Sequence, residues 1–487
     1  MRMNWIGQTA TAKESQVDSL RLLNAYPEAV ASRQGKTAVA LYGTPGLKRF
    51  LTLPGSGMVR GLYRASDAQV FAVMGSVLYQ VTASGTASPL GTLQSTLTPV
   101  VFADNGLAMV LVDKITSGYM VNLHSHSFDA LMTPNNTPAD RVVFFDNRLL
   151  INKQGTQQYQ WTDLVSTDIG GLNFQSVDGA PDLLLSMEMM HRELWLPGVV
   201  TTEVHADTGD ADIPFARIQG AFVEMGIVGP HAIAKVGDTL IWVMQSAQGT
   251  GMVVQASGYN AQRISTHDVE QALQRYETLS DCLAWSQQQD GHLFCWLTFP
   301  SAGHTWVFDA TSGLWHERGW RNPATGQVGR HRANCYAYAF GKHLVGDFED
   351  GRVYELDSET YSDDGDTLLF EATLPPVFDA NSMNRMRFDY LQIECATGVG
   401  LEVATNALGY DPQFMLLLSN DGGKTWPIER PKSMGKIGEY TTAVYWWQLG
   451  SAYDRRFKLR ISDPVKRVIL GANIEATMLG PRGGVSG

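Results

Sequence analysis

Short apolar runs joined by tight polar turns recur along most of the chain. In Phe71–Tyr79 the turn is Gly75-Ser76, and in Arg141–Ile151 it is Asp146-Asn147. Glycine, asparagine and aspartate tolerate the positive φ angles that two-residue hairpin turns require. Each unit therefore predicts a pair of antiparallel β-strands. Seven such units begin near residues 71, 105, 142, 186, 232, 282 and 335.

The spacing of these hairpins is typical of a repeated architecture. Successive units lie roughly 35 to 53 residues apart, the range expected for four-stranded propeller blades. A hairpin cannot bury its apolar face alone, and radial stacking of small sheets hides these faces while leaving only short edges. We therefore expect an all-β chain in which residues 36–360 form a β-propeller of six or seven blades. A set of β-sandwiches is the alternative.

One segment of the propeller region has a helical pattern instead. Ser265 and Asp268 have the spacing of a capping box, and Val269, Leu273 and Tyr276 follow at helical intervals. The pattern predicts a short helix that connects two blades.

A polar segment separates the hairpins from a second series of strands. Residues 358–366 are rich in Ser, Asp and Gly, which is typical of a linker. Six further strand patterns follow, in 367–374, 386–394, 414–418, 443–447, 457–461 and 468–478. We expect residues 361–487 to form a C-terminal β-sandwich or barrel domain. Residues 1–35 are interpreted as an N-terminal arm or as a contribution to this second domain.

The composition narrows the class of protein. Of the 487 residues 44% are hydrophobic and 18% are charged, and the formal net charge is -12. This balance excludes a chain whose main task is to hold nucleic acid through basic side chains. Four cysteines exclude a disulfide scaffold. No apolar run approaches the ~18 residues of a membrane span, and no secretory signal is predicted at the N-terminus.

The motifs of common enzymes are incomplete here. Two Gly-Lys-Thr tripeptides lack the preceding glycine of a phosphate-binding loop, because Val30 and Leu418 occupy those positions. His316-Glu317 is followed by Trp320 where a zinc-binding helix needs a second histidine. We therefore predict no catalytic residue, no metal site and no cofactor.

Ser419–Trp426 matches the Asp-box pattern Ser-x-Asp-x-Gly-x-Thr-Trp. In such a turn Ser419 and Asp421 accept hydrogen bonds from turn amides, and Gly423 permits the tight bend. Trp426 is expected to pack beneath the turn. We interpret the motif as a structural turn and not as a catalytic site.

Charge is distributed unevenly along the second half of the chain. Residues 347–389 contain twelve Asp or Glu against three Arg, a local charge of -9. Residues 424–467 contain ten Lys or Arg against four Asp or Glu, a local charge of +6. Opposite charges on one chain favour head-to-tail contacts between identical copies. The alternative is that both segments form solvated faces.

Several short segments, taken in order, resemble one known protein family. They are Asn24-Ala25-Tyr26-Pro27-Glu28, Gly35-Lys36, Tyr42–Leu47, Gly258-Tyr259-Asn260, Arg263–His267 with Glu270, Gly291-His292, Phe299-Pro300, Thr305–Asp309 and Trp315–Arg318. These segments are similar to the packaged-DNA stabilisation proteins, also called tail hub or nozzle proteins, of short-tailed phages. The likeness covers residues 20–50 and 215–320. The C-terminal domain resembles the family only in general character, through the Asp-box and the strand Arg455–Arg460.

The resemblance implies an assembly role without catalysis. Such proteins are made in the host cytoplasm and are expected to form a ring, six copies in a hexamer, below the portal and its adaptor in the virion tail. The ring would close the exit channel, retain the packaged double-stranded DNA, form the ejection conduit and attach fibres, spikes or a needle. An acidic or neutral wall suits this role, because basic walls bind phosphates tightly and slow ejection.

Two segments are candidates for these contacts. Residues 197–229 are long and poorly periodic, and we interpret them as an insertion that forms a channel gate or a tail tip. Its acidic side chains are Asp207, Asp210 and Asp212, whose spacing favours a solvated loop over a calcium site. The basic segment 424–467 is the candidate for docking an acidic adaptor surface, through Arg455, Arg456, Lys458 and Arg460.

Two other functions remain open from the sequence. A propeller glycosidase that cuts surface polysaccharide requires two carboxylates at a suitable separation in one pocket. A carbohydrate-binding propeller used for host attachment requires exposed aromatic platforms, for which Trp446 and Trp447 are candidates.

Overall fold

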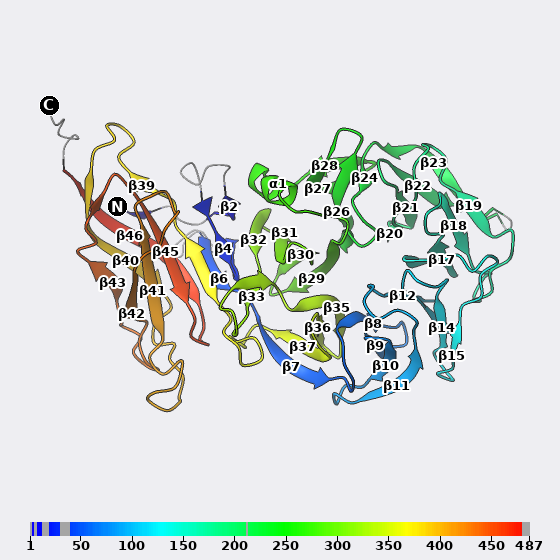
Figure 1. The fold of residues 1–487 in the computed structure, drawn as a ribbon, viewed down its shortest axis with the longest axis horizontal. Helices are drawn as coiled ribbons and strands as arrows, with labels where there is room; N and C mark the ends of the chain where they lie inside the picture. The colour runs from blue at the N-terminus through cyan, green and yellow to red at the C-terminus, as the bar shows by residue number, and fades with distance from the viewer. Residues whose placement is uncertain (1, 4–6, 12–18, 30–38, 211–212, 480–487) are drawn as a thin grey trace.

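The computed structural model of the chain describes residues 2–3, 7–11, 19–29, 39–210 and 213–479. Within these ranges the regular structure is almost all strand, with one helix, α1 (His267–Gln274). Figure 1 shows a ring of small sheets, with a smaller two-layered body beside it. The prediction of an all-β propeller followed by a β-sandwich is confirmed.

In the described residues, seven blades of four or five strands surround a common centre (Figure 1); six are separate sheets, and blade 6 is part of a ten-stranded sheet. Blade 1 contains β8 (Val59–Arg64), β9 (Val70–Met74), β10 (Val77–Val81) and β11 (Ala87–Thr92). Blade 2 contains β12 (Val101–Asp104), β13 (Ala108–Val112), β14 (Tyr119–Asn122) and β15 (Phe128–Ala130). Blade 3 contains β16 (Val142–Phe145), β17 (Arg148–Asn152), β18 (Gln158–Trp161) and β19 (Phe174–Ser176).

The remaining blades follow the same plan. Blade 4 contains β20 (Glu188–Met190), β21 (Glu193–Pro197), β22 (Thr202–Asp207) and β23 (Phe215–Val223). Blade 5 contains β24 (Gly226–Ile227), β25 (Ile233–Val236), β26 (Thr239–Ser246), β27 (Gly249–Ser257) and β28 (Asn260–Arg263). Blade 6 contains β29 (Leu283–Gln289), β30 (His292–Phe299), β31 (His304–Asp309) and β32 (Leu314–Glu317). Blade 7 contains β35 (Ala333–Ala339), β36 (Lys342–Asp347), β37 (Arg352–Asp357) and β7 (Gly46–Thr52).

Each of the seven predicted hairpins is present, one in each blade. The turn residues adopt the backbone angles that their types permit: Asp146 and Asn147 have φ of 47° and 58°, and Gly75 has φ of 52°. Because the turn chemistry fixes the register of a hairpin locally, these pairs were visible in the sequence.

Blade 7 closes the ring with a strand from the other end of the propeller sequence. Its outermost strand, β7, pairs antiparallel with β37, and Leu47 lies opposite Leu356. The ring is therefore held shut by backbone hydrogen bonds between segments about 300 residues apart.

The C-terminal domain consists of two sheets that pack face to face. The first has the order β43 (Val444–Trp447), β40 (Met386–Cys395), β46 (Val468–Met478), β6 (Val39–Gly43) and β5 (Ala25–Ala29). The second runs through β4 (Leu22–Leu23), β38 (Phe370–Thr373), β45 (Asp454–Ile461), β41 (Gln413–Ser419) and β42 (Glu429–Ser433). Strand β6 lies inside the range 36–360 predicted for the propeller, yet it pairs with the sandwich strand β46.

One continuous sheet links the two domains. Strand β4 pairs with β32 of blade 6 on one side and with β38 of the sandwich on the other. Part of the predicted N-terminal arm is therefore built into the junction between the domains.

Short strand pairs complete the described structure. They are β1 (Arg2–Met3) with β46, β2 (Ala10–Thr11) with β3 (Ser19–Leu20), β33 (Gly319–Arg321) with β34 (Val328–Arg330), β39 (Val377–Phe378) with β45, and β44 (Ser451–Ala452) with β40.

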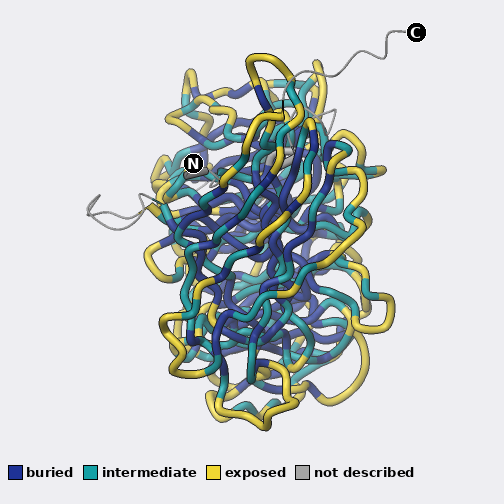
Figure 2. Tube along the Cα trace, turned by 90° about the vertical axis from the view of Figure 1, so that its left-hand side faces the viewer, coloured by how far each residue is buried: buried dark blue, intermediate teal, exposed yellow. Residues whose placement is uncertain are grey.

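Apolar side chains fill the spaces between blades and between the sandwich sheets. Figure 2 shows the buried strands in the middle of the molecule and the exposed loops around its periphery. Fully buried tryptophans carry much of the propeller core, among them Trp195, Trp242 and Trp296. Each such side chain buries a large apolar area, so the core is expected to dominate the stability of the propeller.

Two local predictions need correction. Residues 197–229 are not an irregular insertion, because they form β22, β23 and β24; the β22–β23 register shifts between Glu203 and His205, which hides the alternation in the sequence. The predicted helix is present, but Thr266 rather than Ser265 is its N-cap and accepts a hydrogen bond from the Val269 amide.

Candidate functional site: the propeller–sandwich junction

Asn24 connects the two domains through its side chain. Its Nδ2 donates hydrogen bonds to the carbonyls of Gly319 in the propeller and Leu369 in the sandwich, both at 2.8 Å. Its Oδ1 accepts from the Gly319 amide at 3.0 Å. The residue is fully buried with φ of 52°, an angle that asparagine tolerates better than most residues. Asn24 is the first residue of the Asn-Ala-Tyr-Pro-Glu segment.

Tyr26, in the same segment, joins motif residues that lie far apart in sequence. Its ring packs edge-on against His292 and Phe294, with centroids 5.0 and 5.5 Å away. The guanidinium of Arg318 lies 4.7 Å from the Phe294 ring and 4.4 Å from the Trp296 ring. Burial lowers the pKa of Arg318 to about 9, so the buried group stays charged at neutral pH. Residues from three of the motif segments, Tyr26, His292 and Arg318, therefore meet in one packed cluster on blade 6.

A network of charges around two buried carboxylates lies beside this cluster. Arg21 donates to Glu317 Oε2 at 2.7 Å, and its other nitrogen lies 3.8 Å from Glu371 Oε1. Glu371 also pairs with Lys458 at 3.1 Å and with Arg460 at 3.0 Å. The network joins the N-terminal segment, blade 6 and the sandwich.

The electrostatics of this network keep its carboxylates ionised. Burial alone would raise the pKa of Glu317, but Arg21 outweighs it and holds the pKa at about 2. For Glu371 burial is likewise outweighed, by Lys458, Arg21 and Arg460, so its pKa lies below the ordinary value. Breaking one member of such a network leaves an uncompensated buried charge, which is strongly destabilising.

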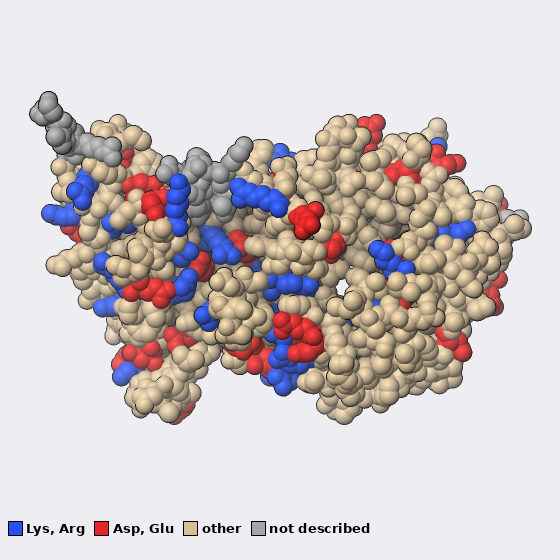
Figure 3. Space-filling model, viewed as in Figure 1, with Lys and Arg blue, Asp and Glu red and all other residues tan. Residues whose placement is uncertain are grey.

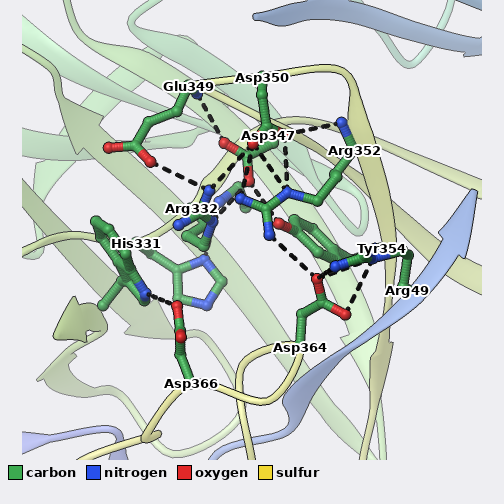
Figure 4. A network of polar contacts seen from close by, with 12 residues as sticks. Arg49, His331, Arg332, Asp347, Glu349, Asp350, Arg352, Tyr354, Asp364 and Asp366 are labelled. Carbon is green, nitrogen blue, oxygen red and sulfur yellow. Dashed lines mark hydrogen bonds and ion pairs between the residues drawn. The ribbon is translucent and has the colours of Figure 1, made fainter. Parts of the chain in front are cut away.

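The linker between the domains is anchored to the propeller by acidic side chains (Figure 4). Asp364 pairs with Arg49 and, at 3.2 Å, with Arg352. Asp366 accepts a hydrogen bond from the Trp320 indole at 3.1 Å. These contacts bind the end of the predicted linker to blade 7 and to β33.

Above these contacts, blade 7 contains a buried ion pair (Figure 4). Arg332 Nε donates to Asp347 Oδ2 at 2.6 Å, and the Tyr354 hydroxyl donates to the same oxygen at 2.6 Å. The Arg332 guanidinium also lies 4.4 Å from the Trp320 ring. The pair stabilises the blade that closes the ring.

Asp363 belongs to the same linker but approaches the sandwich. It is 1% exposed, and among the described residues neither carboxylate oxygen has a hydrogen-bond partner. Burial raises its pKa to about 7, against the opposing effect of Arg467. Arg467 is itself buried and donates to the Tyr361 carbonyl. Sequence reasoning missed this pair, because nothing in its local pattern marks two charges as buried.

The residues predicted to dock an adaptor lie on β45, and two of them are not on the surface. Arg455 is 2% exposed and donates to Asn420 Oδ1 and the Leu449 carbonyl, while Arg456 is fully buried. The other two, Lys458 and Arg460, hold Glu371 as described above. The prediction that all four side chains dock an adaptor is therefore corrected for Arg455 and Arg456, because both are buried, whereas Lys458 and Arg460 remain partly exposed.

Lys458 and Arg460 line a groove between the domains. The groove has a volume of about 550 Å³ and is lined by the loop after β33, strand β4 and the outer face of the second sandwich sheet. Figure 3 shows Lys and Arg side chains gathered around this junction, while the outer blades carry few charges on the same face.

The Asp-box forms a hydrogen-bonded turn after β41. Asp421 Oδ1 accepts from the amides of Lys424 and Thr425, both at 3.0 Å, and Ser419 Oγ accepts from the Gly423 amide at 2.9 Å. Trp426 is half-buried, and the Lys458 ammonium lies 4.4 Å from its ring. The turn thus borders the junction groove.

The acidic residues predicted for a gate lie at the far rim of the propeller. Asp207 ends β22, and Asp210 is exposed in the turn that leads to β23, in blade 4 and away from the sandwich (Figure 1). Asp212 lies outside the described residues. The turn joins the two outermost strands of its blade, so it does not reach the centre of the propeller.

The centre of the propeller is narrow. A cavity of about 230 Å³ lies among the innermost strands, where Arg60, Trp285 and Tyr336 are among its lining residues. Figure 3 shows only a small opening at this place. A sphere of this volume is only about 8 Å across, whereas a DNA duplex is wider than its own major groove of about 12 Å, so a duplex cannot pass through this cavity.

These features define a class of protein. In the described residues it is a seven-bladed β-propeller that is joined to a β-sandwich through strand β4 of the N-terminal segment. The family is shown by sequence. Residues 10–361 match the family model described as Bacteriophage P22 Gp10, beta-propeller, and residues 375–477 match Bacteriophage P22 Gp10, beta-sandwich. The chain belongs to this family of phage DNA-stabilisation proteins, and it is a component of a phage virion.

The solved structures that match the chain are remote in sequence, and no curated protein matches it. The computationally designed Ika8 protein is 13% identical, with a TM-score of 0.41 over 64% of this chain and 99% of that one. The N-terminal domain of Nup159 is 10% identical, with a TM-score of 0.43 over 69% and 99%. The WD40 β-propeller domain of Doa1 is 13% identical, with a TM-score of 0.41 over 64% and 97%. No helix in the described part of the chain is long and apolar enough to cross a membrane.

Proposed function

We propose that the protein is a tail hub, or nozzle, that forms a ring below the portal and its adaptor and retains packaged DNA. The ring is a hexamer, and the protein acts without catalysis. On infection the same ring becomes the conduit through which the DNA leaves. Fibres, spikes or a needle attach to it.

The observation that carries this proposal is the narrow centre of the propeller. Because a cavity of about 230 Å³ cannot admit a duplex, one chain cannot be the channel by itself. A DNA-stabilisation protein of this shape must therefore enclose the channel between several copies. Closed cyclic symmetry is the usual solution for such an assembly.

Charge supports a conduit that does not hold the DNA. The chain has a net charge of -12, and phosphates bind strongly only where several lysines or arginines are presented together. An acidic wall keeps the duplex centred and leaves it free to move. The exposed turn with Asp207 and Asp210 is the candidate for a gate or a distal tip of this ring.

Native mass spectrometry of the purified chain, alone and with a portal–adaptor complex, tests the proposal. The expected result is a closed ring of six copies bound to the complex. A single copy bound to the portal complex, or a chain that never binds it, contradicts the proposal.

A further inference from the structure

The junction groove carries an excess of positive charge in an acidic protein. Its lining includes Arg21, Arg321, Lys458 and Arg460, against Glu371 and Glu429. Arg21 also pairs with Glu317, so three carboxylates offset only part of the four positive charges, in a chain whose net charge is -12. A groove of one sign on a surface of the other sign is a recognition feature.

Among the cations of the groove, Arg321 is the one whose guanidinium N–H donors have no partner in the described residues. It lies at the end of β33, is half-buried against the groove, and forms no ion pair or side-chain hydrogen bond among the described residues. A guanidinium has five N–H donors in a planar fork that matches a carboxylate. Lys458 and Arg460, on the opposite wall, keep 14% and 31% of their side chains exposed.

The groove also presents apolar surface between its charged walls. Val328 and Met415, which are partly exposed, belong to the lining, and so do Leu23 and Leu369, which are buried. A volume of about 550 Å³ is within the range of ordinary ligand pockets, about 300–1,000 Å³. An occupant that matches these walls therefore carries both carboxylates and apolar side chains.

We propose that the groove binds an extended, acidic segment of a partner protein, in which carboxylate and apolar side chains alternate. A carboxylate of the segment pairs with Arg321, and others approach Lys458 and Arg460. The inference rests on the proposed function for the source of the segment, a neighbouring protein of the virion tail. Recognition of acidic motifs by arginine clusters is a general mode of peptide binding.

A polypeptide fits this groove better than DNA does. The cations lie along the walls of a concave groove, where the phosphates of a convex duplex cannot reach them together. Glu371 and Glu429 would repel a phosphate backbone, whereas a flexible segment can place its carboxylates away from them. The apolar lining adds nothing to phosphate binding.

Occupation of the groove would lock the two domains together. One wall comes from the propeller, through Arg321 and Val328, and the other comes from the sandwich, through Lys458 and Arg460. A bound segment therefore contacts both domains at once. Attachment of the partner thereby fixes the orientation of the propeller relative to the sandwich.

Fluorescence anisotropy with the full-length protein tests this inference. The probe is a short fluorescein-labelled peptide of alternating Glu and Leu, with a Lys and Leu peptide of equal length as its control. Wild-type protein binds the acidic peptide, more weakly as salt is added. Arg321→Ala weakens binding on the order of tenfold, and Arg321→Lys falls between, because a point charge lacks the fork.

Arg64→Ala is the matched control. Arg64 is an exposed arginine on β8 with no ion pair or side-chain hydrogen bond among the described residues, so its removal should leave peptide binding unchanged. Circular dichroism of all variants establishes that they fold. Equal loss of binding in Arg321→Ala and Arg64→Ala overturns the inference, as does failure of the wild type to bind the acidic peptide.

In a further measurement, labelled duplex DNA replaces the peptide as the probe. If DNA binds more tightly than the peptide and loses affinity in Arg321→Ala, the groove is a nucleic-acid site and the inference is wrong. The proposed function fails separately: a chain that binds the peptide but forms no ring with the portal–adaptor complex contradicts the hub. A ring that forms without peptide binding contradicts only the groove.

Discussion

The propeller and the sandwich are both built from antiparallel strands, yet they complete their sheets differently. Blades 1 to 5 consist of consecutive strands, whereas in the described residues blade 7 takes the distant strand β7 and blade 6 is extended by the distant strand β4. The sandwich takes β4, β5 and β6 from the opposite end of the chain. The propeller is thus mostly a product of local pairing, whereas the sandwich and the junction depend on long-range contacts.

This difference indicates which segment the stability of both domains depends on. Strand β4 lies in the junction, β5 and β6 lie in the sandwich, and β7 lies in blade 7. Displacement of this segment would expose an edge in both domains. Stability of the two domains is therefore expected to be coupled, and substitutions can separate or strengthen that coupling.

Asp347→Ala is expected to have the largest effect, on the propeller. It leaves the buried Arg332 without its partner at 2.6 Å, which should cost about 3–5 kcal/mol in the free energy of unfolding. Denaturant unfolding, followed by tryptophan fluorescence, measures this change in the free energy of unfolding. Glu349→Ala is the matched control, because this more exposed partner of the same arginine should contribute less than about 1 kcal/mol. Equal effects of the two variants would contradict the role of the buried pair.

Asn24→Ala should separate the two domains. It removes three buried hydrogen bonds that join Gly319 and Leu369 through one side chain, at an expected cost of about 3 kcal/mol. Calorimetry should then show the single unfolding transition broaden or split. Asn24→Gly relieves the positive φ but still lacks the side chain, so recovery in that variant would assign the effect to backbone strain instead.

Asp363→Asn should alter the pH dependence of stability. The pKa of Asp363 is about 7 in the folded chain and ~3.9 when unfolded, so its contribution is fully present below pH ~4 and is lost as the pH rises through 7. Between pH 5 and 7 the wild type should lose about 2 kcal/mol relative to the variant. Arg467, Arg332 and Asp366 are the charges that act on this group. Parallel curves for the two proteins, measured by urea unfolding, would show that Asp363 does not titrate there.

Asp421→Ala should have the smallest effect and should act on the sandwich alone. The carboxylate accepts from two turn amides and from the Thr425 hydroxyl, so its loss is expected to cost about 1 kcal/mol. Lys424→Ala, in the same turn, is the control and should be nearly neutral. A shift of the propeller transition in Asp421→Ala would mean that the turn supports the junction as well.

Much of the fold was predictable because its signals are local. Turn residues such as Asp146 and Asn147 mark each hairpin, and the six strand patterns after residue 366 all correspond to strands. The irregular β22–β23 pair was not predicted, because a register shift disrupts the alternation of apolar and polar residues along the strand. The distant partners of strands β4, β6 and β7 were not predicted either, because nothing in a short strand identifies a partner hundreds of residues away.

The site was predictable only in part. The motif residues Asn24 and Tyr26 were visible as a resemblance, but their physical roles depend on Gly319, Leu369 and Phe294. The sequence predicts adaptor docking through all four basic residues of β45, because a sequence cannot distinguish a solvated arginine from one with a buried partner.

A density map of the assembled virion tail tests the central claim most directly, namely that DNA passes between copies of this chain. The account predicts a closed ring of propellers whose centres lie away from the channel, with DNA density on the ring axis. Density for DNA through the centre of a propeller, or a single copy on the tail axis, would contradict it.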